Sequence, residues 1–242
     1  MPPPSAPPEV RDRLALALDF DDLVVAMRWA QRMKPSFGVA KVGLELWSGA
    51  GPSAVTELAG QGFKVFADLK LADIPNTTYR AARVLGSTGA SYLTVHAFAG
   101  LACLRAAVEG FADGAERAGL SPPTVLAVTV LTSEVEAPAD VLAERCRLAS
   151  EAGCGGFVCA AGDLAAAKGA APKLLAFVPG IRLAGEGEDD HGRPSTPRAA
   201  VAAGADVLVV GRAVTAAADP DGAAAAVVAE VAEEAARWRW TR

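Results

Sequence analysis

Short, almost uninterrupted apolar segments alternate with longer alanine-rich segments along nearly the whole chain. The apolar segments are rich in β-branched residues, a pattern typical of strands that are buried on both faces. Their starts lie roughly 19 to 33 residues apart, which suits repeating strand–helix units. We predict eight strands, over Leu14–Phe20, Phe37–Leu44, Phe63–Lys70, Ser91–Phe98, Thr124–Thr132, Gly156–Ala161, Leu175–Ile181 and Asp206–Val210.

Apolar strands separated by helices predict a parallel sheet with both faces covered. Eight such units favour closure into a (β/α)8 TIM barrel over an open doubly wound sheet. Helix signals agree, since Asp21 or Asp22 can cap a helix that runs to Met33. No break in composition marks a second domain. We therefore predict a proline-rich flexible tail over residues 1–10 and a single catalytic barrel over residues 11–242.

Composition and charge narrow the classes of function. A chain of 242 residues suits one barrel, and a hydrophobic fraction of 52% predicts a large core. The net charge of −5 argues against nucleic-acid binding, which needs a basic surface. No run of about 18 apolar residues occurs, so we expect no membrane span. The start, MPPPSAPPEV, lacks the regions of a secretory signal, so we expect a cytoplasmic protein.

The cysteines indicate a reducing compartment. All of them fall in apolar stretches without a CxxC pair, so we expect buried free thiols: Cys103, Cys146, Cys154 and Cys159. A metal site would need tighter clustering with histidine. We therefore predict no metal site.

Charged residues stand at predicted strand ends, where a purely structural strand would not place them. Asp19 ends the first strand, Lys41 lies in the second, and Arg182 follows the seventh. Asp68 and Lys70 end the third. Active sites of TIM barrels lie at the carboxyl ends of the strands, so these five residues are candidates for the active site.

The third strand carries the densest group of charges. Residues two apart in a strand face the same side, so Asp68 and Lys70 should point together into the barrel mouth. With Lys41 from the adjacent strand and Asp73 from the following loop, they predict an alternating chain Lys41–Asp68–Lys70–Asp73. Paired charges hold a fixed geometry, as electrostatic catalysis requires. A salt-bridge layer that closes the barrel is the structural alternative, but the cluster exceeds what closure needs.

At these positions the sequence resembles the orotidine 5′-phosphate decarboxylases of bacterial type. The matching segments occur in family order and span nearly all of the chain after the tail. The DxKxxD motif alone marks a broader group of barrels, but the segments that accompany it here make the resemblance specific. They are Leu16–Asp19, Lys41–Gly43, Phe66–Thr77, Thr94–Ala97, Val130–Ser133, Pro179–Arg182 and Val210–Arg212.

The resemblance implies decarboxylation of orotidine 5′-phosphate to UMP in de novo pyrimidine biosynthesis, without a metal or another cofactor. Lys70 would stabilise the carbanion that forms at C6 of the pyrimidine and would then protonate it. Asp68 would lie near the substrate carboxylate. Asp19 and Lys41 would bind the ribose hydroxyls.

The family also builds its site across a two-fold homodimer. Asp73 and Thr77 would then reach into the partner subunit's site, and Ile74 in the same loop becomes a candidate substrate contact. Thr132 would contact the pyrimidine, although a helix-capping hydroxyl is the alternative interpretation of that residue.

The substrate phosphate should lie after strands seven and eight, the usual phosphate site of this fold. Arg182 and Arg212 would bind it, with Gly211 allowing close approach of the backbone. The acidic, glycine-rich stretch 184–192 is expected to act as a lid. Family members usually carry a glutamine there, where this chain has His191. Either the histidine substitutes for the glutamine, or the contact lies one residue away.

Two other functions remain as alternatives. Magnesium-dependent sister enzymes, such as keto-gulonate-phosphate decarboxylase and hexulose-phosphate synthase, share DxKxxD but lack the full Ile-Pro-Asn-Thr loop. A non-catalytic phosphosugar-binding barrel would bind UMP without turnover. The intact set of Asp68, Lys70 and Asp73 argues against this second alternative.

Overall fold

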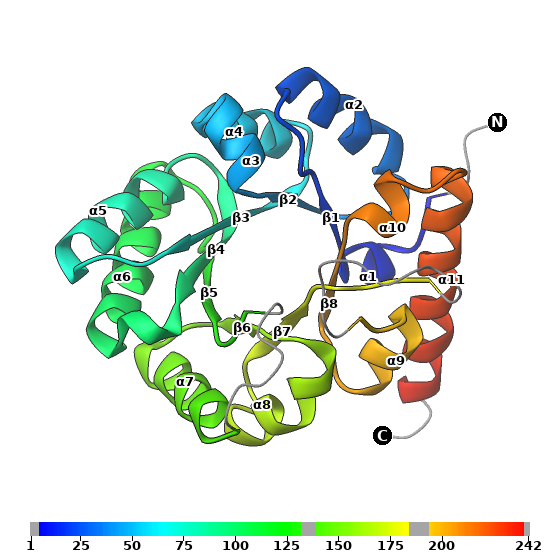
Figure 1. Ribbon diagram of the computed structural model, residues 1–242. Helices are drawn as coiled ribbons and strands as arrows, with labels where there is room; N and C mark the ends of the chain where they lie inside the picture. The colour runs from blue at the N-terminus through cyan, green and yellow to red at the C-terminus, as the bar shows by residue number, and fades with distance from the viewer. Residues whose placement is uncertain (1–4, 132–138, 184–193, 240–242) are drawn as a thin grey trace.

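The predicted barrel is confirmed in a computed structural model, which describes residues 5–131, 139–183 and 194–239 (Figure 1). Eight parallel strands form a closed ring in sequence order, and β1 pairs with β8 to close it. The strands are β1 (Leu14–Ala17), β2 (Val39–Val42), β3 (Lys64–Leu71), β4 (Ala90–His96), β5 (Thr124–Val128), β6 (Gly156–Val158), β7 (Leu175–Val178) and β8 (Val207–Val210).

Every predicted strand exists, but most of them end earlier than the apolar pattern predicts. Strand β1 stops at Ala17 and leaves Asp19 in the following loop, while β5 stops at Val128. The apolar pattern continues beyond the sheet because residues such as Val130 and Leu131 line a cavity at the barrel mouth. The apolar pattern therefore includes cavity-lining residues that follow the last paired residue of a strand.

Both faces of the strands are buried, which explains the uninterrupted apolar runs. In β1, Ala15 and Ala17 face the barrel interior, whereas Leu14 and Leu16 pack in the layer between sheet and helices. Three aromatic rings fill the interior, with centroids 5.0 to 6.4 Å apart: Phe66, Tyr92 and Phe177. The interior of the barrel is therefore a packed core.

Helices surround the sheet in Figure 1, as the strand–helix repeat predicts. The principal helices are α2 (Leu23–Met33), α3 (Leu44–Ala50), α4 (Pro52–Gly60), α5 (Pro75–Gly86), α6 (Leu101–Arg117), α7 (Ala139–Ala152), α8 (Leu164–Ala170), α9 (Pro197–Ala202) and α11 (Pro220–Arg239). Short helices also occur at α1 (Pro8–Arg11), α10 (Arg212–Thr215), η1 (Ala97–Ala99) and η2 (Ala161–Asp163).

Local signals fix the ends of the helices. The Asp22 side chain accepts a hydrogen bond from the Val25 backbone N–H at 2.9 Å and so caps α2. The expected tail boundary at residue 10 falls within α1, whose Val10 is buried in the core. The packed part of the chain therefore includes a residue that the composition assigned to the tail.

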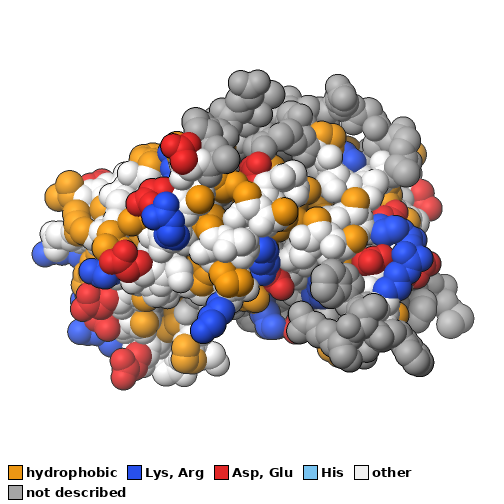
Figure 2. All heavy atoms as spheres, turned by 90° about the horizontal axis from the view of Figure 1, so that it is seen from below, with side chains coloured by type: hydrophobic (Ala, Val, Ile, Leu, Met, Phe, Trp, Pro, Cys, Tyr) orange, Lys and Arg blue, Asp and Glu red, His pale blue; other side chains and the backbone are white. Residues whose placement is uncertain are grey.

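The outer surface carries both signs of charge. On the face shown in Figure 2, lysine and arginine side chains lie among aspartate and glutamate side chains. None of the helices within the described ranges has the length and apolar character needed to cross a membrane.

Candidate active site

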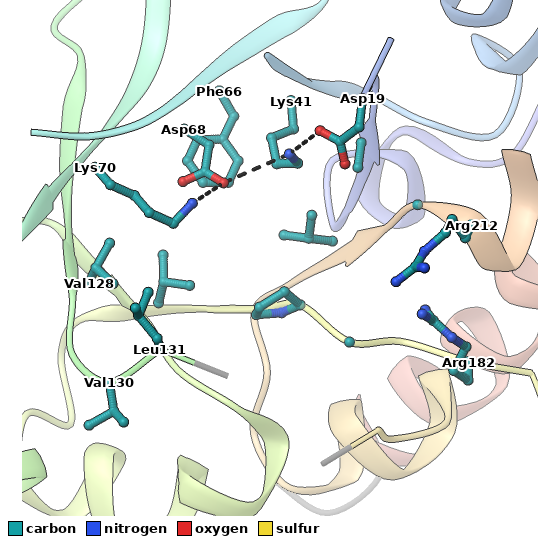
Figure 3. A pocket seen from close by; sticks show the side chains of 16 residues that line it. Asp19, Lys41, Phe66, Asp68, Lys70, Val128, Val130, Leu131, Arg182 and Arg212 are labelled. Atoms are coloured by element: carbon teal, nitrogen blue, oxygen red, sulfur yellow. Dashed lines mark hydrogen bonds and ion pairs between the residues drawn. The ribbon is translucent and has the colours of Figure 1, made fainter. Parts of the chain in front are cut away.

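A cavity of about 270 Å³ opens at the carboxyl ends of the strands (Figure 3). Its lining combines charged, apolar and glycine residues that are distant in the sequence and come from most strands of the barrel. They are Ala17, Asp19, Lys41, Phe66, Asp68, Lys70, Val128, Val130, Leu131, Val158, Pro179, Gly180, Arg182, Val209, Gly211 and Arg212. The structure thus brings the predicted charged residues of strands one, two, three, seven and eight to one place.

Four of these residues form an alternating chain of charges. Lys41 Nζ lies 2.8 Å from Asp19 Oδ1 and 3.8 Å from Asp68 Oδ2. Asp68 Oδ2 also lies 2.8 Å from Lys70 Nζ. Figure 3 shows the resulting order Asp19, Lys41, Asp68, Lys70 along one wall of the cavity. Because each inner charge has an opposite charge on both sides, the array holds its shape at a modest electrostatic cost.

The prediction placed Asp73 at one end of this chain of charges, but Asp73 does not line the cavity of its own subunit. Asp73 is exposed, and its Oδ1 accepts a hydrogen bond from the Ile74 backbone N–H at 2.6 Å. Its carbonyl oxygen accepts from Cys103 Sγ at 2.6 Å and from Thr78 Oγ1 at 3.3 Å. These bonds turn the segment toward the start of α5 and away from the cavity, and Asp19 takes the fourth place in the array.

Asp68 and Lys70 do face the same cavity, but the alternation of a regular strand is only part of the reason. Ala67 pairs with Leu93 and Leu71 pairs with Val95. Between these two pairs β3 advances by four residues and β4 by only two. Lys70 has a φ of 50°, a left-handed conformation that is unusual for a residue with a side chain. A bulge therefore aims the lysine at the cavity.

Asp68 stays ionised in spite of its burial. Burial alone would raise the pKa of Asp68, but Lys41 and Lys70 favour the charged form, as do hydrogen bonds from Lys70 and Thr94. Together these interactions hold the pKa below its ordinary value. The carboxylate can therefore act as a fixed negative charge at neutral pH.

The opposite wall of the cavity is apolar. Val128, Val130 and Leu131 lie across from Lys70 in Figure 3, and Val158 and Val209 also line the cavity. Apart from Leu131, all of these side chains are buried or half-buried. A flat, weakly polar ring fits between such a wall and the charged array.

Two arginines form a third region of the cavity. Figure 3 shows Arg182 and Arg212 side by side, on the far side of the cavity from Lys70. Arg182 is buried, and its Nη1 donates to the carbonyl of Ile181 at 2.8 Å. A Cβ placed on Gly211 would meet only Ala17 Cβ, at an ordinary 3.4 Å. The missing side chain thus leaves open space beside the arginines, where an anion can approach the backbone.

Several predicted site residues lie away from this cavity or outside the described residues. Ile74 and Thr77 are exposed at the start of α5, beside Asp73, and none of the three lines the cavity of their own subunit. Thr132, His191 and the predicted lid over residues 184–192 fall outside the described ranges.

Sequence reasoning gave no role to two residues that touch the array. Thr94 donates its hydroxyl to Asp68, and Gly43 lies against the Asp19–Lys41 pair. Both belong to segments that carry the family resemblance, namely Thr94–Ala97 and Lys41–Gly43. A hydroxyl between the apolar residues Leu93 and Val95 was the signal for Thr94; its partners could not be identified without the fold.

The cysteines are free and buried, as predicted. Burial raises the pKa of Cys154 to about 12 and that of Cys146 to about 11, so neither is a thiolate at neutral pH. Among the residues that the structure describes, no group of three or more His, Cys, Asp or Glu side chains could hold a metal ion.

Comparison with known proteins identifies relatives over nearly the whole chain. The model of the family "Orotidine 5'-phosphate decarboxylase / HUMPS family" matches residues 12–227. A protein of Anaeromyxobacter dehalogenans named orotidine 5'-phosphate decarboxylase is 44% identical over 90% of this chain and 97% of its own. One of Moorella thermoacetica with the same name is 40% identical, over 91% and 92%. The crystal structure of orotidine 5'-phosphate decarboxylase from Lactobacillus acidophilus superposes with a TM-score of 0.77 and 33% identity, over 91% and 99%.

Proposed function

The chain belongs to the orotidine 5′-phosphate decarboxylase / HUMPS family, and we propose that its cavity decarboxylates orotidine 5′-phosphate with Lys70 as the proton donor. The family model also covers sugar-phosphate enzymes, so it does not by itself choose the substrate. The relatives at 40 to 44% identity are all named orotidine 5'-phosphate decarboxylase, and they indicate orotidine 5′-phosphate as the substrate. The activity is conversion of orotidine 5′-phosphate to UMP in pyrimidine synthesis.

The observation that carries the proposal is the order of the charged groups along the cavity. Lys70 and Asp68 lie at one end, Lys41 and Asp19 follow, and the two arginines lie beyond Asp19 (Figure 3). Orotidine 5′-phosphate presents a carboxylated pyrimidine, a ribose and a phosphate in the same order. The base would lie against the apolar wall, the ribose hydroxyls at Asp19 and Lys41, and the phosphate at Arg182, Gly211 and Arg212.

The chemical difficulty is the negative charge left on C6 when carbon dioxide departs. A group lowers the barrier only if it stabilises this developing charge more strongly than it stabilises the bound substrate. The ammonium group of Lys70 would lie beside C6, stabilise the carbanion and then give it a proton. Its geometry is fixed in advance by the pair with Asp68, 2.8 Å away.

Asp68 contributes through repulsion. A substrate carboxylate about 4 Å from the ionised Asp68 would be repelled by about 4 kcal/mol at an effective dielectric near 20. Loss of carbon dioxide relieves this repulsion, because the product has no carboxylate. We rank the contribution below that of Lys70, since the effect raises the ground state and binding energy elsewhere must compensate for it.

The remaining site residues belong to a homodimer in this proposal. Asp73, Ile74 and Thr77 are exposed together beside the barrel mouth, and a two-fold partner would carry them into the neighbouring cavity. Asp73 would then stand near Lys70 and touch the ribose.

Thr132 is proposed to contact the pyrimidine and His191 to close over base and phosphate.

A magnesium-dependent sister activity would use Asp68 differently. Magnesium prefers carboxylate oxygens, but Oδ2 of Asp68 already contacts two lysines and Oδ1 accepts from Thr94. A metal ion there would have to displace these partners, so the observed contacts favour the metal-free reaction.

The test is the ultraviolet absorbance change when orotidine 5′-phosphate is mixed with the pure protein, with and without EDTA. Metal-free decarboxylation predicts turnover at enzyme-like rates that EDTA does not alter. Loss of activity with EDTA, regained with magnesium, would favour the sister chemistry instead. Tight binding of UMP without any turnover would favour a non-catalytic phosphosugar-binding barrel.

A further inference from the structure

The backbone around Lys70 is irregular, although it carries the central lysine of the site. Within the described ranges, Lys70 is the one non-glycine residue with a positive φ, at 50°. The register between β3 and β4 shifts between Ala67 and Leu71, so the residues in between leave the regular ladder. Such a conformation costs free energy and persists only where surrounding contacts hold it.

Thr94 on β4 provides these contacts. Its side chain is fully buried, and its Oγ1 accepts a hydrogen bond from the Lys70 backbone N–H at 2.9 Å. The same hydroxyl donates to Asp68 Oδ1 at 3.0 Å. A hydroxyl has one proton, so accepting from Lys70 leaves that proton for the carboxylate. Thr94 thus satisfies a backbone group that the bulge removes from the ladder.

These bonds form a closed ring. The backbone of Lys70 connects through Thr94 to Oδ1 of Asp68, and Oδ2 of Asp68 returns to Nζ of Lys70 at 2.8 Å. Both ends of the lysine, its backbone and its ammonium group, are therefore tied to a single buried hydroxyl and a single carboxylate. Rotation of the Thr94 or the Asp68 side chain would break a hydrogen bond of this ring.

We propose that Thr94 is a positioning residue for the decarboxylation, holding the Lys70 backbone and the Asp68 carboxylate in one fixed geometry. The inference rests on the role proposed for Lys70. Thr94 does not line the cavity and would not touch the substrate, so it acts through Lys70 and Asp68. Its hydroxyl also contributes to keeping Asp68 ionised, alongside Lys41 and Lys70.

Packing alone does not explain a threonine at this position. The neighbouring β4 residues Leu93 and Val95 are apolar and fully buried, and valine would fill the volume of Thr94. Valine would also leave the Lys70 N–H and one oxygen of Asp68 without this partner. The hydroxyl is therefore the part of the side chain with a function, and it can be removed with little change of shape.

The experiment compares steady-state kinetics and UMP binding for Thr94→Val, Thr94→Ser and the unmodified protein. A misplacement of the order of 1 Å costs about 100-fold in rate, so Thr94→Val should lower kcat by about that factor. UMP lacks the carboxylate, so its Kd should change by no more than about threefold if only the geometry of Lys70 and Asp68 is lost. Thr94→Ser keeps the hydroxyl and should restore most of kcat.

Thr129→Val is the matched control. Thr129 is equally buried at the end of the next strand, and its hydroxyl donates to the Val158 carbonyl at 2.9 Å, away from the charged array. Its loss should lower thermal stability much as Thr94→Val does, with kcat preserved. If Thr94→Val does not fold, Thr94→Ser and Thr94→Ala provide the same comparison, because they differ only by the hydroxyl.

The outcomes separate this inference from the proposed function. A Thr94→Val protein with kcat within about threefold of normal, beside an inactive Lys70→Ala protein, overturns the role of Thr94 alone. A Thr94→Ser protein as slow as Thr94→Val also overturns it, because packing of the methyl group would then be the cause. A Lys70→Ala protein that still turns over overturns the proposed function itself.

Discussion

Gly43 provides the sharpest test of how closely the charged array is packed. A Cβ at this position would lie 2.7 Å from Asp19 Oδ1 and 2.9 Å from Lys41 Nζ. The φ of Gly43 is −87°, which any residue adopts, so space and not backbone conformation requires the glycine. Both close atoms are the ends of flexible side chains. Gly43→Ala should therefore fold normally and force the ion pair apart.

The size of the effect follows from the distance between the two charges. An ordinary contact with the new methyl group requires the pair to open from 2.8 Å by about 1 Å. At a dielectric of 20 the attraction would weaken by about 1.5 kcal/mol, and in bulk water by about 0.4 kcal/mol. The Asp19 side chain is 54% exposed, which places the site between these limits. We expect a loss of about 0.5 to 1 kcal/mol, or two- to fivefold in kcat/KM.

The assay is initial-rate kinetics with orotidine 5′-phosphate, together with thermal unfolding of each protein. Gly169→Ala in α8 is the control, because a Cβ there meets no atom within 4 Å. It should leave kcat/KM unchanged and raise stability slightly, as alanine does in helices. The reasoning is refuted if Gly43→Ala matches the unmodified protein within 1.5-fold of its kcat/KM, roughly the precision of such rates and below the effect derived for the pair. Loss of the folded protein would refute it as well, since the neighbours would then not yield.

Three further predictions concern the charges themselves. Lys70→Ala should abolish turnover while UMP still binds. Mixing this variant with Asp73→Ala should restore some activity in heterodimers, because one of the two sites then has both residues. Heterodimers without any recovery of activity would contradict shared sites. Asp68 has a lowered pKa, so the stability it adds is present above its unfolded pKa near 3.9 and is lost as pH falls through the folded pKa. Asp68→Asn should therefore flatten the decline of unfolding free energy below about pH 4, measured by urea titration, and an unchanged decline would contradict the assignment. Arg212→Ala should weaken UMP binding by about tenfold or more and leave uridine binding nearly unchanged, as calorimetry can measure; equal losses would place the phosphate elsewhere.

The barrel was predictable because burial on both faces leaves a simple trace in the sequence. The apolar runs located every strand. The ends of the strands could not be located in this way, because residues beyond them, such as Val130, are also apolar and line the cavity. Asp68 and Lys70 were placed correctly with an incomplete reason. The bulge at Lys70 depends on a register shift against β4, which is a property of two strands and leaves no local pattern.

Asp73 and Thr94 show the same limit from opposite sides. The motif put Asp73 within reach of Lys70, but hydrogen bonds to the Ile74 backbone N–H and to Cys103 of α6 hold it outside the cavity. Thr94 gave only a weak signal, a hydroxyl between two apolar residues, although it contacts both Lys70 and Asp68. In both cases a residue from another element, Cys103 of α6 for Asp73 and Thr94 of β4 for Lys70 and Asp68, makes the contact, and sequence separation hides it.

The charge of the cavity contrasts with the charge of the chain. The protein carries −5 overall, yet the described residues that line the cavity include four cations, Lys41, Lys70, Arg182 and Arg212, against two carboxylates, Asp19 and Asp68. A small trianionic nucleotide can enter this local excess of positive charge, whereas a polyanion would meet the acidic exterior. In the proposed reaction, decarboxylation removes one negative charge from the bound molecule and with it the repulsion from Asp68. The product would then have no charged group at the Lys70 end, while its phosphate would still bind the arginines. This predicts that release of UMP depends on the arginine end of the cavity and that the chemical step depends on the lysine end.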